Sequence, residues 1–472
     1  MEPTKSVGIL LMQSTIEDVI TAVKAAESVC ANYKHINVRL FVHPHVIESG
    51  LINVSRGCCL TSYKLFSKFK SRGFNHIING SPILATASTY EEKMVALYES
   101  MLDFLYEVVK PIVVDTFAVS KQIVWTSVFN PCDGYGSSAE QMIMALDNVQ
   151  DWSVVFKPHR LQSLHLAQPS SYKIYNRSKA YTLRGFVDAH YLYYAQPHEV
   201  PLQQVYKGYK VNFTMWESSR VPGSWPSAMK NYDMVFTPSE WGKQAMQQCG
   251  VSTPIHVVPL GVNTNIFTYK KKKPRKGKFK FLLYANSHWE NERKNYQQTC
   301  DAFAKVFCNN NDVELVLKLT EGNKPKVKCN NIKPIYGRLA PSTLNELLHD
   351  CDCFIFVSSG EGFGLPPREA LATGTPTIIG NTSALQDVAK PEFCVPVQPT
   401  GKKVPRDYPG IYGKPKSLGY LDTYNVLDIC DSMLHVYNNY SDCIEVAEYA
   451  SQHIQQNMTY KNTAQRITEI LV

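Results

Sequence analysis

The stretch SSGEGFGLPPREALATGTPTIIGN, residues 358–381, decides the expected fold because it carries the signals of a strand–loop–helix–strand unit. The run CFIFV (353–357) before it is continuously apolar, which is typical of a strand buried on both faces of a parallel sheet. Pro366 and Pro367 suit the first turn of a helix, where no internal N–H donors are needed. Gly374 is expected to end that helix, and the apolar run after it begins the next strand. The stretch therefore predicts a parallel α/β domain.

Two carboxylates, Glu361 and Glu369, flank the predicted start of this helix. Open α/β sheets bind their ligands at the carboxyl ends of the strands, which is where this loop is expected to lie. Gly362 and Gly364 let the backbone approach a ligand closely, and the N-terminus of a helix favours phosphate. A helix-start role for both acids, favoured by the helix dipole, explains Glu369 but neither Glu361 nor the glycines. Glycines for phosphates and carboxylates for sugar hydroxyls together predict a nucleotide-sugar site.

Apolar runs alternate with helical patterns along nearly the whole chain, which is the signature of parallel α/β domains. The 472 residues are too many for one ordinary core, and 44% hydrophobic with 19% charged residues are typical of a globular chain. A helical pattern runs from Glu91 to Val109. The charged run TYKKKKPRKGKFK (268–280) is interpreted as a solvated linker. The expected strands form three series: residues 7–11, 37–42, 75–78 and 111–114; residues 122–128, 152–156, 189–195, 209–216, 233–238 and 255–261; and residues 279–285, 313–319, 333–337, 353–357 and 376–380.

Bulk properties narrow the class of protein. No segment approaches 18 consecutive apolar residues, and no cleavage site follows the N-terminal apolar run, so neither a transmembrane helix nor a secretory signal is expected. The thirteen cysteines include no CxxC and no zinc-finger spacing, which predicts that most of them are small apolar core residues of a reduced, cytoplasmic protein. The formal charge of +8 fits an anionic small molecule, an acidic membrane surface or nucleic acid equally well.

Residues 358–381 resemble the E-x7-E region of retaining GT-B glycosyltransferases of family 4, the glycosyl transferases of group 1. The pattern typical of that family is S-x-x-E-G-F-G-L-P-x-x-E-A-x-A-x-G-x-P-V-I, and this chain departs from it at Thr377, where valine is common. The resemblance extends from Lys121 to the C-terminus and does not include residues 1–115. The further segments that carry it are residues 214–267, 284–307, 313–319 and 428–472.

The resemblance implies an α/β protein of GT-B fold, in which two Rossmann-like domains face a cleft, with an extra small α/β domain at the N-terminus. We predict an accessory domain over residues 1–118, an acceptor domain over 119–268 and a nucleotide-sugar donor domain over 269–457. The last segment, 458–472, is expected to be a helix that crosses back onto the acceptor domain. For the accessory domain, acceptor binding, oligomerisation and a degenerate second transferase-like half all stay open.

The resemblance also assigns roles to the residues of the opening stretch. In this family the second glutamate holds the ribose hydroxyls of the donor, which implies that role for Glu369. The first glutamate contacts the transferred sugar close to the reacting face, which implies a catalytic role for Glu361. The backbone N–H groups of Phe363 and Gly364, next to Gly362, are expected to hold sugar hydroxyls or phosphate oxygens.

Cations are implied for the leaving diphosphate, where fixed positive charge lowers the barrier most. Lys294, with Arg293 beside it, resembles the diphosphate-binding base of the family. Family members often have an arginine directly after the first strand of this domain, and here that region reads YANSHWE. Arg293 either replaces that arginine or faces solvent, as in a surface pair at a helix start. Lys318 ends its strand and either reaches the nucleotide or points to water.

Three features of the second strand series resemble the acceptor side of the family. The motif Gly134-Tyr135-Gly136 follows a strand and resembles the glycine loop that closes over the donor diphosphate, although a tight turn explains it equally well. His198 and Glu217 follow predicted strands, where family members often have a histidine or an acid near the acceptor hydroxyl. His190 and His159 compete with His198, and a lone histidine after a strand is more often a structural hydrogen-bonding residue.

The reaction implied by the resemblance is transfer of a hexose or related sugar to an acceptor hydroxyl, by front-face displacement with retention at the anomeric carbon. No protein nucleophile is expected, and no DxD motif lies in a suitable loop, so neither a metal nor another cofactor is predicted. The expected partners are a UDP-, GDP- or ADP-sugar donor and a glycan, glycoprotein or glycolipid acceptor.

Two other functions stay open at this point. One is a sugar phosphorylase of the same architecture, which requires a lysine-bound pyridoxal phosphate. The other is a catalytically silent module that binds sugar or nucleic acid, for which the basic run 268–280 is the best support. Contact of that run with a membrane surface also stays open, whereas a nucleic-acid partner is not expected.

Overall fold

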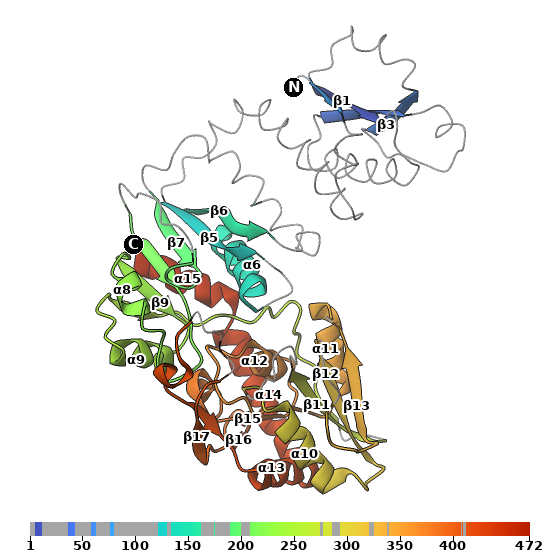
Figure 1. Ribbon diagram of the computed structural model, residues 1–472. Coiled ribbons are helices and arrows are strands. Elements are labelled where there is room, and N and C mark those ends of the chain that lie inside the picture. Colours follow the sequence, from blue (N-terminus) through green and yellow to red (C-terminus); the bar gives the residue numbers. More distant parts are fainter. Residues whose placement is uncertain are drawn as a thin grey trace. The chain divides into compact units, whose positions relative to one another are not determined.

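The structure of the protein, a computed structural model, divides into two compact units; it describes parallel strands in the first, and strands and helices in the second (Figure 1). The strands β1 to β4 lie in the first unit, and every other described strand and helix lies in the second. The described residues are 5–11, 36–42, 58–62, 76–79, 121–129, 134–161, 174, 189–199, 208–273, 277–285, 293–320, 325–337, 339–406, 408 and 412–472.

The first unit contains a parallel sheet with the strand order β3-β2-β1-β4. Its strands are β1 (Lys5–Leu11), β2 (Ile36–Val42), β3 (Cys58–Ser62) and β4 (His76–Asn79). Three of these strands lie where the sequence predicts them, whereas β3, with the short sequence CCLTS, has too weak an apolar pattern to be predicted. The predicted strand at 111–114 and the predicted helix at 91–109 lie outside the described residues.

The first sheet of the second unit has six parallel strands in the order β10-β9-β8-β7-β5-β6. All six lie at predicted positions, although β8 and β10 are shorter than their apolar runs. The strands are β5 (Lys121–Phe129), β6 (Trp152–Leu161), β7 (His190–Tyr194), β8 (Lys210–Phe213), β9 (Met234–Thr237) and β10 (Ile255–Val257). The helices that follow them are α6 (Gly134–Asp147), α8 (Trp225–Met229) and α9 (Glu240–Gln248).

The second sheet of this unit has six parallel strands in the order β13-β12-β11-β14-β15-β16, so chain order reverses between β11 and β14. This is the strand order of a Rossmann domain. The strands are β11 (Phe279–Ala285), β12 (Val313–Leu319), β13 (Ile332–Tyr336), β14 (Cys353–Phe356), β15 (Thr377–Gly380) and β16 (Val395–Val397). The helices are α10 (Tyr296–Phe307), α11 (Pro341–Asp350), α12 (Leu365–Ala372), the 3-10 turn η3 (Ser383–Asp387) and α13 (Val426–Asn438). A short antiparallel pair, β17 (Gly401–Lys403) and β18 (Leu421–Thr423), follows β16.

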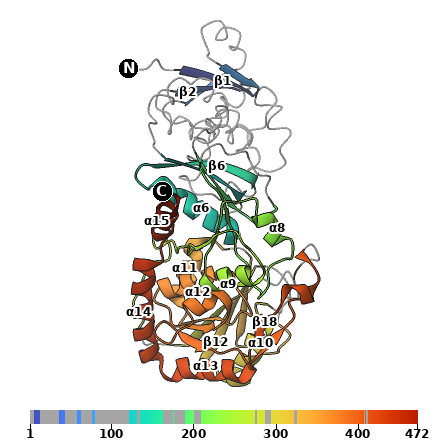
Figure 2. The same cartoon turned by 90° about the vertical axis from the view of Figure 1, so that its left-hand side faces the viewer.

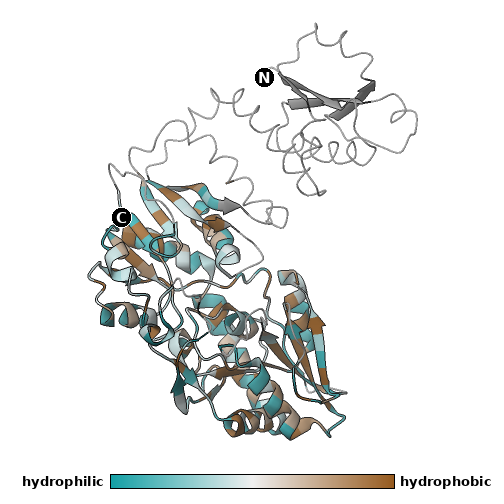
Figure 3. Ribbon diagram, viewed as in Figure 1, coloured by the Kyte–Doolittle hydropathy of each residue, from teal (hydrophilic) through white to brown (hydrophobic). Residues whose placement is uncertain are grey.

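Hydrophobic residues run along the strands of both six-stranded sheets (Figure 3). In β11, Phe281 packs with Phe303 of α10 in one core, whereas the neighbouring Leu282 packs with Leu371 of α12 in another. Because successive side chains of a strand point to opposite faces, these two cores lie on the two sides of the sheet. Helices therefore cover both faces, which explains the continuous apolar runs that the sequence shows.

The C-terminus returns to the first six-stranded sheet. After α14 (Tyr440–Asn457), the helix α15 (Tyr460–Leu471) packs against α6, and both views place these two helices side by side (Figures 1 and 2). Thr459 pairs with Val262 in an isolated bridge, and Thr463 Oγ1 donates to the carbonyl oxygen of Pro259 at 2.9 Å. Chain segments from both ends of the second unit thus meet around α15.

One lysine of the charged run 268–280 corrects its interpretation as a solvated linker. Lys272 is buried, and its Nζ donates to the carbonyl oxygens of Leu348, His349 and Cys351 at 2.7, 3.0 and 2.5 Å. These carbonyls end α11, where a cation also compensates the helix dipole. Lys272 is therefore a structural cap, while Lys271 is exposed as predicted.

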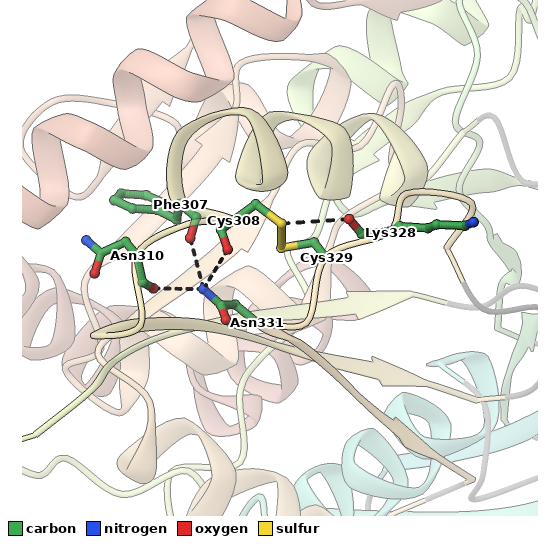
Figure 4. The surroundings of a disulfide bond; sticks show 6 residues. All are labelled: Phe307, Cys308, Asn310, Lys328, Cys329 and Asn331. Atoms are coloured by element: carbon green, nitrogen blue, oxygen red, sulfur yellow. Dashed lines mark hydrogen bonds between the residues drawn. A yellow bond between two sulfur atoms is a disulfide. The ribbon is translucent and has the colours of Figure 1, made fainter.

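A disulfide joins Cys308, at the end of α10, to Cys329, before β13 (Figure 4). Asn331 holds the same corner, because its Nδ2 donates to the carbonyl oxygens of Phe307 at 2.9 Å and Asn310 at 2.7 Å. The prediction of unpaired, reduced cysteines is wrong for this pair. It is confirmed for the described cysteines that are free and buried, which are Cys300, Cys351, Cys353, Cys394, Cys430 and Cys443.

Within the described ranges, the structure has no helix with the length and apolar character needed to cross a membrane.

Candidate functional site

The candidate site lies at the carboxyl ends of β11 and β14, the neighbouring strands between which chain order reverses. Hydrogen bonds join the segment before α10 to the loop after β14. The N–H of Ser359 donates to the carbonyl oxygen of Arg293 at 2.7 Å. Asn295 has a left-handed φ of 50°, and its Nδ2 donates to the carbonyl oxygen of Val357 at 2.9 Å and to Ser359 Oγ at 2.8 Å. The sheet thus brings two predicted parts of the site together.

Glu361 is buried and faces both predicted cations. Its Oε1 lies 2.5 Å from Lys294 Nζ and 3.1 Å from Arg293 Nη1, which also donates to the carbonyl oxygen of Gly360 at 2.7 Å. Burial raises the pKa of Glu361, but Lys294 and Arg293 outweigh that effect and lower the pKa to about 2. The carboxylate is therefore ionised and paired with two positive charges. Arg293 faces the site and not solvent.

Glu369 has the opposite environment. It lies within α12, after the first turn, and is half-buried. Among the described residues, no hydrogen bond or ion pair reaches its carboxylate, and burial raises its pKa to about 7. Its charge acts on Tyr284 of β11 and Tyr460 of α15, since it raises the pKa of both phenols after the larger effect of burial. An unpaired carboxylate of this kind can accept hydrogen bonds from ligand hydroxyls.

Backbone donors lie between the two acids. In the part of the chain that the structure describes, the N–H groups of Gly362, Phe363, Gly364 and Leu365 have no hydrogen-bond acceptor. Gly364 has a φ of 82°, which favours glycine. A Cβ on Gly362 would lie 2.7 Å from Met215 Cγ, so the loop has no room for a side chain there. The glycines therefore let this loop lie against the other sheet while its N–H groups stay available.

Residues after β8 of the first six-stranded sheet form the opposite side of this loop. A Cβ on Gly360 would lie 2.3 Å from the carbonyl oxygen of Glu217. The carboxylate of Glu217 accepts a hydrogen bond from the Tyr408 hydroxyl at 3.3 Å, and its charge contributes to raising the pKa of Arg293. Glu217 is therefore near enough to Arg293 for its charge to act on it, and its acceptor-side role stays a prediction.

The predicted loop Gly134-Tyr135-Gly136 is in fact the first turn of α6. The helix begins earlier than predicted, and Ser138 Oγ donates to the carbonyl oxygen of Gly134 at 2.6 Å within its first turns. The Tyr135 hydroxyl accepts the N–H of Met215 at 3.3 Å, and its ring packs on Tyr194 with centroids 4.9 Å apart. Tyr135 thus reaches the site indirectly, through the residue that contacts Gly362.

The remaining predicted residues lie further from the acid pair. His198 is exposed in the turn after β7. Its competitor His190 begins β7, and its Nδ1 accepts the N–H of Tyr209 at 3.2 Å, which is the structural role foreseen for a lone histidine. Lys318 Nζ donates to Thr320 Oγ1 at 3.3 Å and lies 6.0 Å from the ring centre of Tyr284, near the end of β12.

Some site residues were not predicted from the sequence. Arg368, in α12, is wholly buried beside the glycine loop, and Tyr408 is hydrogen-bonded to Glu217. Lys403 Nζ donates to Asn295 Oδ1 at 3.2 Å. Arg368 occupies a position that the family pattern leaves variable, and the other two lie after β16 in a segment without any motif. Only their contacts in the fold reveal them.

Comparison with known protein families gives a match over β11 to β16. Residues 265–401 match the family described as glycosyl transferases group 1. The chain is also 31% identical over 145 residues to an MMP alpha-(1->4)-mannosyltransferase of Mycolicibacterium hassiacum, a similarity that covers 29% of this chain. The chain thus spans only about a third, 34%, of the length of that curated relative.

Solved structures resemble a larger part of the chain. A structure from E. coli described as trehalose-6-phosphate bound with UDP-2-fluoro glucose has a TM-score of 0.51 at 8% identity and covers 74% of this chain and 99% of that one. The N-terminal domain of trehalose-6-phosphate phosphatase from Candida albicans has a TM-score of 0.51 at 12% identity, with 75% and 97% covered. At these identities the likeness concerns the fold alone. The predicted GT-B fold, with two Rossmann-like sheets, is confirmed.

Proposed function

We propose that the chain is a retaining glycosyltransferase that moves a hexose from a nucleotide-sugar to a hydroxyl of a glycan, glycoprotein or glycolipid. The observation that carries this proposal is the unpaired Glu369 carboxylate, separated by free backbone N–H groups from the paired Glu361 and its cations. A nucleotide-sugar presents the matching groups in the same order: ribose hydroxyls, an anionic diphosphate and sugar hydroxyls. The family match over residues 265–401 and the name of the mannosyltransferase relative support the same class of reaction.

In this proposal each part of the site has one role. Glu369 accepts hydrogen bonds from the ribose hydroxyls of the donor. Lys294 and Arg293 stabilise the charge that develops on the leaving diphosphate, which preorganised cations do at no cost of reorganisation. Glu361 holds these two cations in place and contacts the hydroxyls of the transferred sugar. The N–H groups of Phe363 and Gly364 donate to oxygens of the same donor.

The proposed reaction breaks the bond between the anomeric carbon and the donor phosphate oxygen. The acceptor hydroxyl forms the new bond on the same face, and its proton passes to the departing phosphate oxygen. The anomeric carbon keeps its configuration, and no covalent intermediate with the protein forms. His198 and Glu217 remain proposed residues of the acceptor side. Independence of a metal ion and a cytoplasmic location likewise remain predictions.

The domain division is part of the proposal. Residues 119–268 with the helix 458–472 serve as the acceptor domain, and 269–457 serve as the donor domain. The accessory role of residues 1–118 stays unassigned. The donor base is one of uracil, guanine or adenine, and the UDP-2-fluoro glucose named for one structural neighbour supports a nucleotide-sugar donor.

A thermal-shift screen against UDP, GDP, ADP and their sugars tests the proposal. A ligand at about 100 times its Kd stabilises the folded state by about 2.7 kcal/mol, which raises the Tm by several degrees. The matching nucleotide-sugar should then be consumed by the wild type and not by Glu361→Ala. If no nucleotide shifts the Tm and both proteins are inactive while sugar or RNA binds, the silent binding module replaces our proposal. A pyridoxal absorbance in the purified protein would favour the phosphorylase.

A further inference from the structure

Arg368 is a buried cation that the proposed reaction does not use. Its side chain has 0% exposure, and the carboxylate that pairs with it among the described residues, that of Asp387, lies 3.7 Å from Nη2 and is itself 41% exposed. A buried guanidinium is costly unless hydrogen bonds compensate it. Burial is the largest influence on Arg368 and lowers its pKa to about 10. Burial of this guanidinium is therefore unfavourable in itself, and we look for a structural or functional role that explains it.

The compensation comes from carbonyl groups of the glycine loop. Arg368 Nη1 donates to the carbonyl oxygens of Phe363 and, at 3.2 Å, Gly364. Nη2 donates to the carbonyl oxygen of Ala384 in η3 at 3.0 Å. The guanidinium carbon also lies 3.8 Å from the centre of the Phe363 ring, a cation–π distance. One side chain thus holds the loop between the two acids and ties it to η3.

These contacts fix the direction of two backbone donors. In a trans peptide the C=O and the following N–H point to opposite sides of the peptide plane. Because the carbonyls of Phe363 and Gly364 point to Arg368, the N–H groups of Gly364 and Leu365 point away from it. Both N–H groups lack an acceptor among the described residues, and both lie at the start of α12, where the helix dipole favours an anion.

We propose that Arg368 is a positioning residue whose guanidinium orients the N–H groups of Gly364 and Leu365 toward the diphosphate oxygens of the donor. The inference rests on the proposed function, because it assigns the diphosphate to this loop. It adds a residue whose action is indirect: Arg368 touches the loop and not the ligand. A purely stabilising arginine would instead support the fold without any preference for the phosphate part of the ligand.

Lys272 supplies a matched control within the same domain. It is also a buried cation whose donors reach three backbone carbonyls, those that end α11. None of these three carbonyls belongs to the glycine loop. Loss of either cation leaves buried carbonyls without donors and lowers stability, so Lys272→Met reproduces the structural part of the Arg368 defect alone.

The experiment compares Arg368→Met, Arg368→Lys and Lys272→Met with the wild type. The probes are whichever of UDP, GDP and ADP the wild type binds, together with the corresponding nucleoside, which has the base and ribose but no phosphate. Calorimetry measures binding of the nucleotide, and saturation-transfer NMR measures binding of the nucleoside. The Tm reports the stability of each variant. Arg368→Lys retains the charge without the planar fork of donors, so it serves as the milder variant if Arg368→Met does not fold.

We expect Arg368→Met to weaken binding of the nucleoside diphosphate at least ten-fold, while binding of the nucleoside changes less than two-fold. The nucleotide affinity of Arg368→Lys should lie between those of the wild type and Arg368→Met. Lys272→Met should lower the Tm without changing the affinity for nucleotide or nucleoside. Equal losses for nucleotide and nucleoside in the Arg368 variants would overturn the inference and leave the proposed function standing.

A wild type that binds none of the three nucleotides would contradict the proposed function itself. In that case a crystal structure of Arg368→Lys or Arg368→Met decides the inference independently of any ligand. Peptide planes 363–364 and 364–365 that have turned support the orienting role, whereas unchanged planes overturn it.

Discussion

The loop after β14 and the helix α12 each carry one glutamate, and the two side chains have opposite surroundings. Glu361 meets two cations within 3.1 Å, which hold its pKa at about 2 against the effect of burial. Glu369 meets no cation among the residues that the structure describes, and burial raises its pKa to about 7. The difference shows which acid already has partners within the protein when no ligand is bound. Glu361 organises the cations, whereas Glu369 is left for a ligand to satisfy.

Of the variants that test this comparison, Lys294→Ala should have the largest effect, a loss of turnover. It removes one cation from Glu361 and from the leaving diphosphate, while Arg293 stays. Loss of one preorganised group at developing charge costs about 10²–10³ in turnover. Initial rates of nucleotide release from the donor measure it, with Lys271→Ala, an exposed linker lysine, as the control. Equal rates for the two variants would show that Lys294 is a structural partner of Glu361 only.

Glu361→Gln should lower stability at neutral pH, because it leaves two cations partly buried without their counter-charge. The folded pKa of about 2 lies below the ordinary value of 4.5, so the carboxylate contributes stability above pH 4.5 and loses it as pH falls toward 2. That shift corresponds to roughly 3 kcal/mol. Urea unfolding at pH 7 should show this difference in the free energy of unfolding between the wild type and the variant. At low pH the difference should disappear. A variant as stable as the wild type at pH 7 would contradict the ion-pair account.

Glu369→Gln should change stability in the opposite direction. The folded pKa of about 7 lies above 4.5, so the wild-type carboxyl contributes stability below pH 4.5 and loses it as pH rises through 7. An amide does not ionise, so the variant should be more stable by roughly 2–3 kcal/mol at pH 8 and equal at pH 4. It should also bind the donor nucleotide more weakly. A gain in stability with unchanged nucleotide affinity would separate Glu369 from the ligand.

His198→Ala should cause the smallest loss of turnover, because His198 lies away from the two glutamates. The side chain is exposed, and no described contact joins it to Glu361 or Glu369. We expect unchanged nucleotide binding and a loss of turnover below about ten-fold, or 1.4 kcal/mol. Product formation at saturating donor measures it, with nucleotide affinity as the control. A ten-thousand-fold loss would instead identify His198 as a main catalytic group.

The acid pair and its fold could be predicted because their signals are local or periodic. Continuous apolar runs locate the strands, and the spacing of glycines, prolines and acids locates the loop between β14 and α12. The sequence also suggested Arg293 as a site residue, although it left solvent exposure open. The contact with Glu361 resolved that alternative, because only folding brings the two segments together.

Other features depend on contacts between distant residues and left no signal in the chain. Lys272 belongs to a charged run, and its burial follows from where α11 ends. Cys308 and Cys329 pair across 21 positions without a recognisable spacing. Arg368 stands at a variable position of the family pattern, and its role becomes visible only through the carbonyls around it.

A crystal structure with the nucleotide-sugar selected by the thermal-shift screen tests the central claim most directly. Our account predicts the ribose hydroxyls within hydrogen-bond distance of Glu369 and the diphosphate beside Lys294 and the N–H of Gly364. A nucleotide bound elsewhere, with the Glu369 carboxylate still without a ligand, would contradict it.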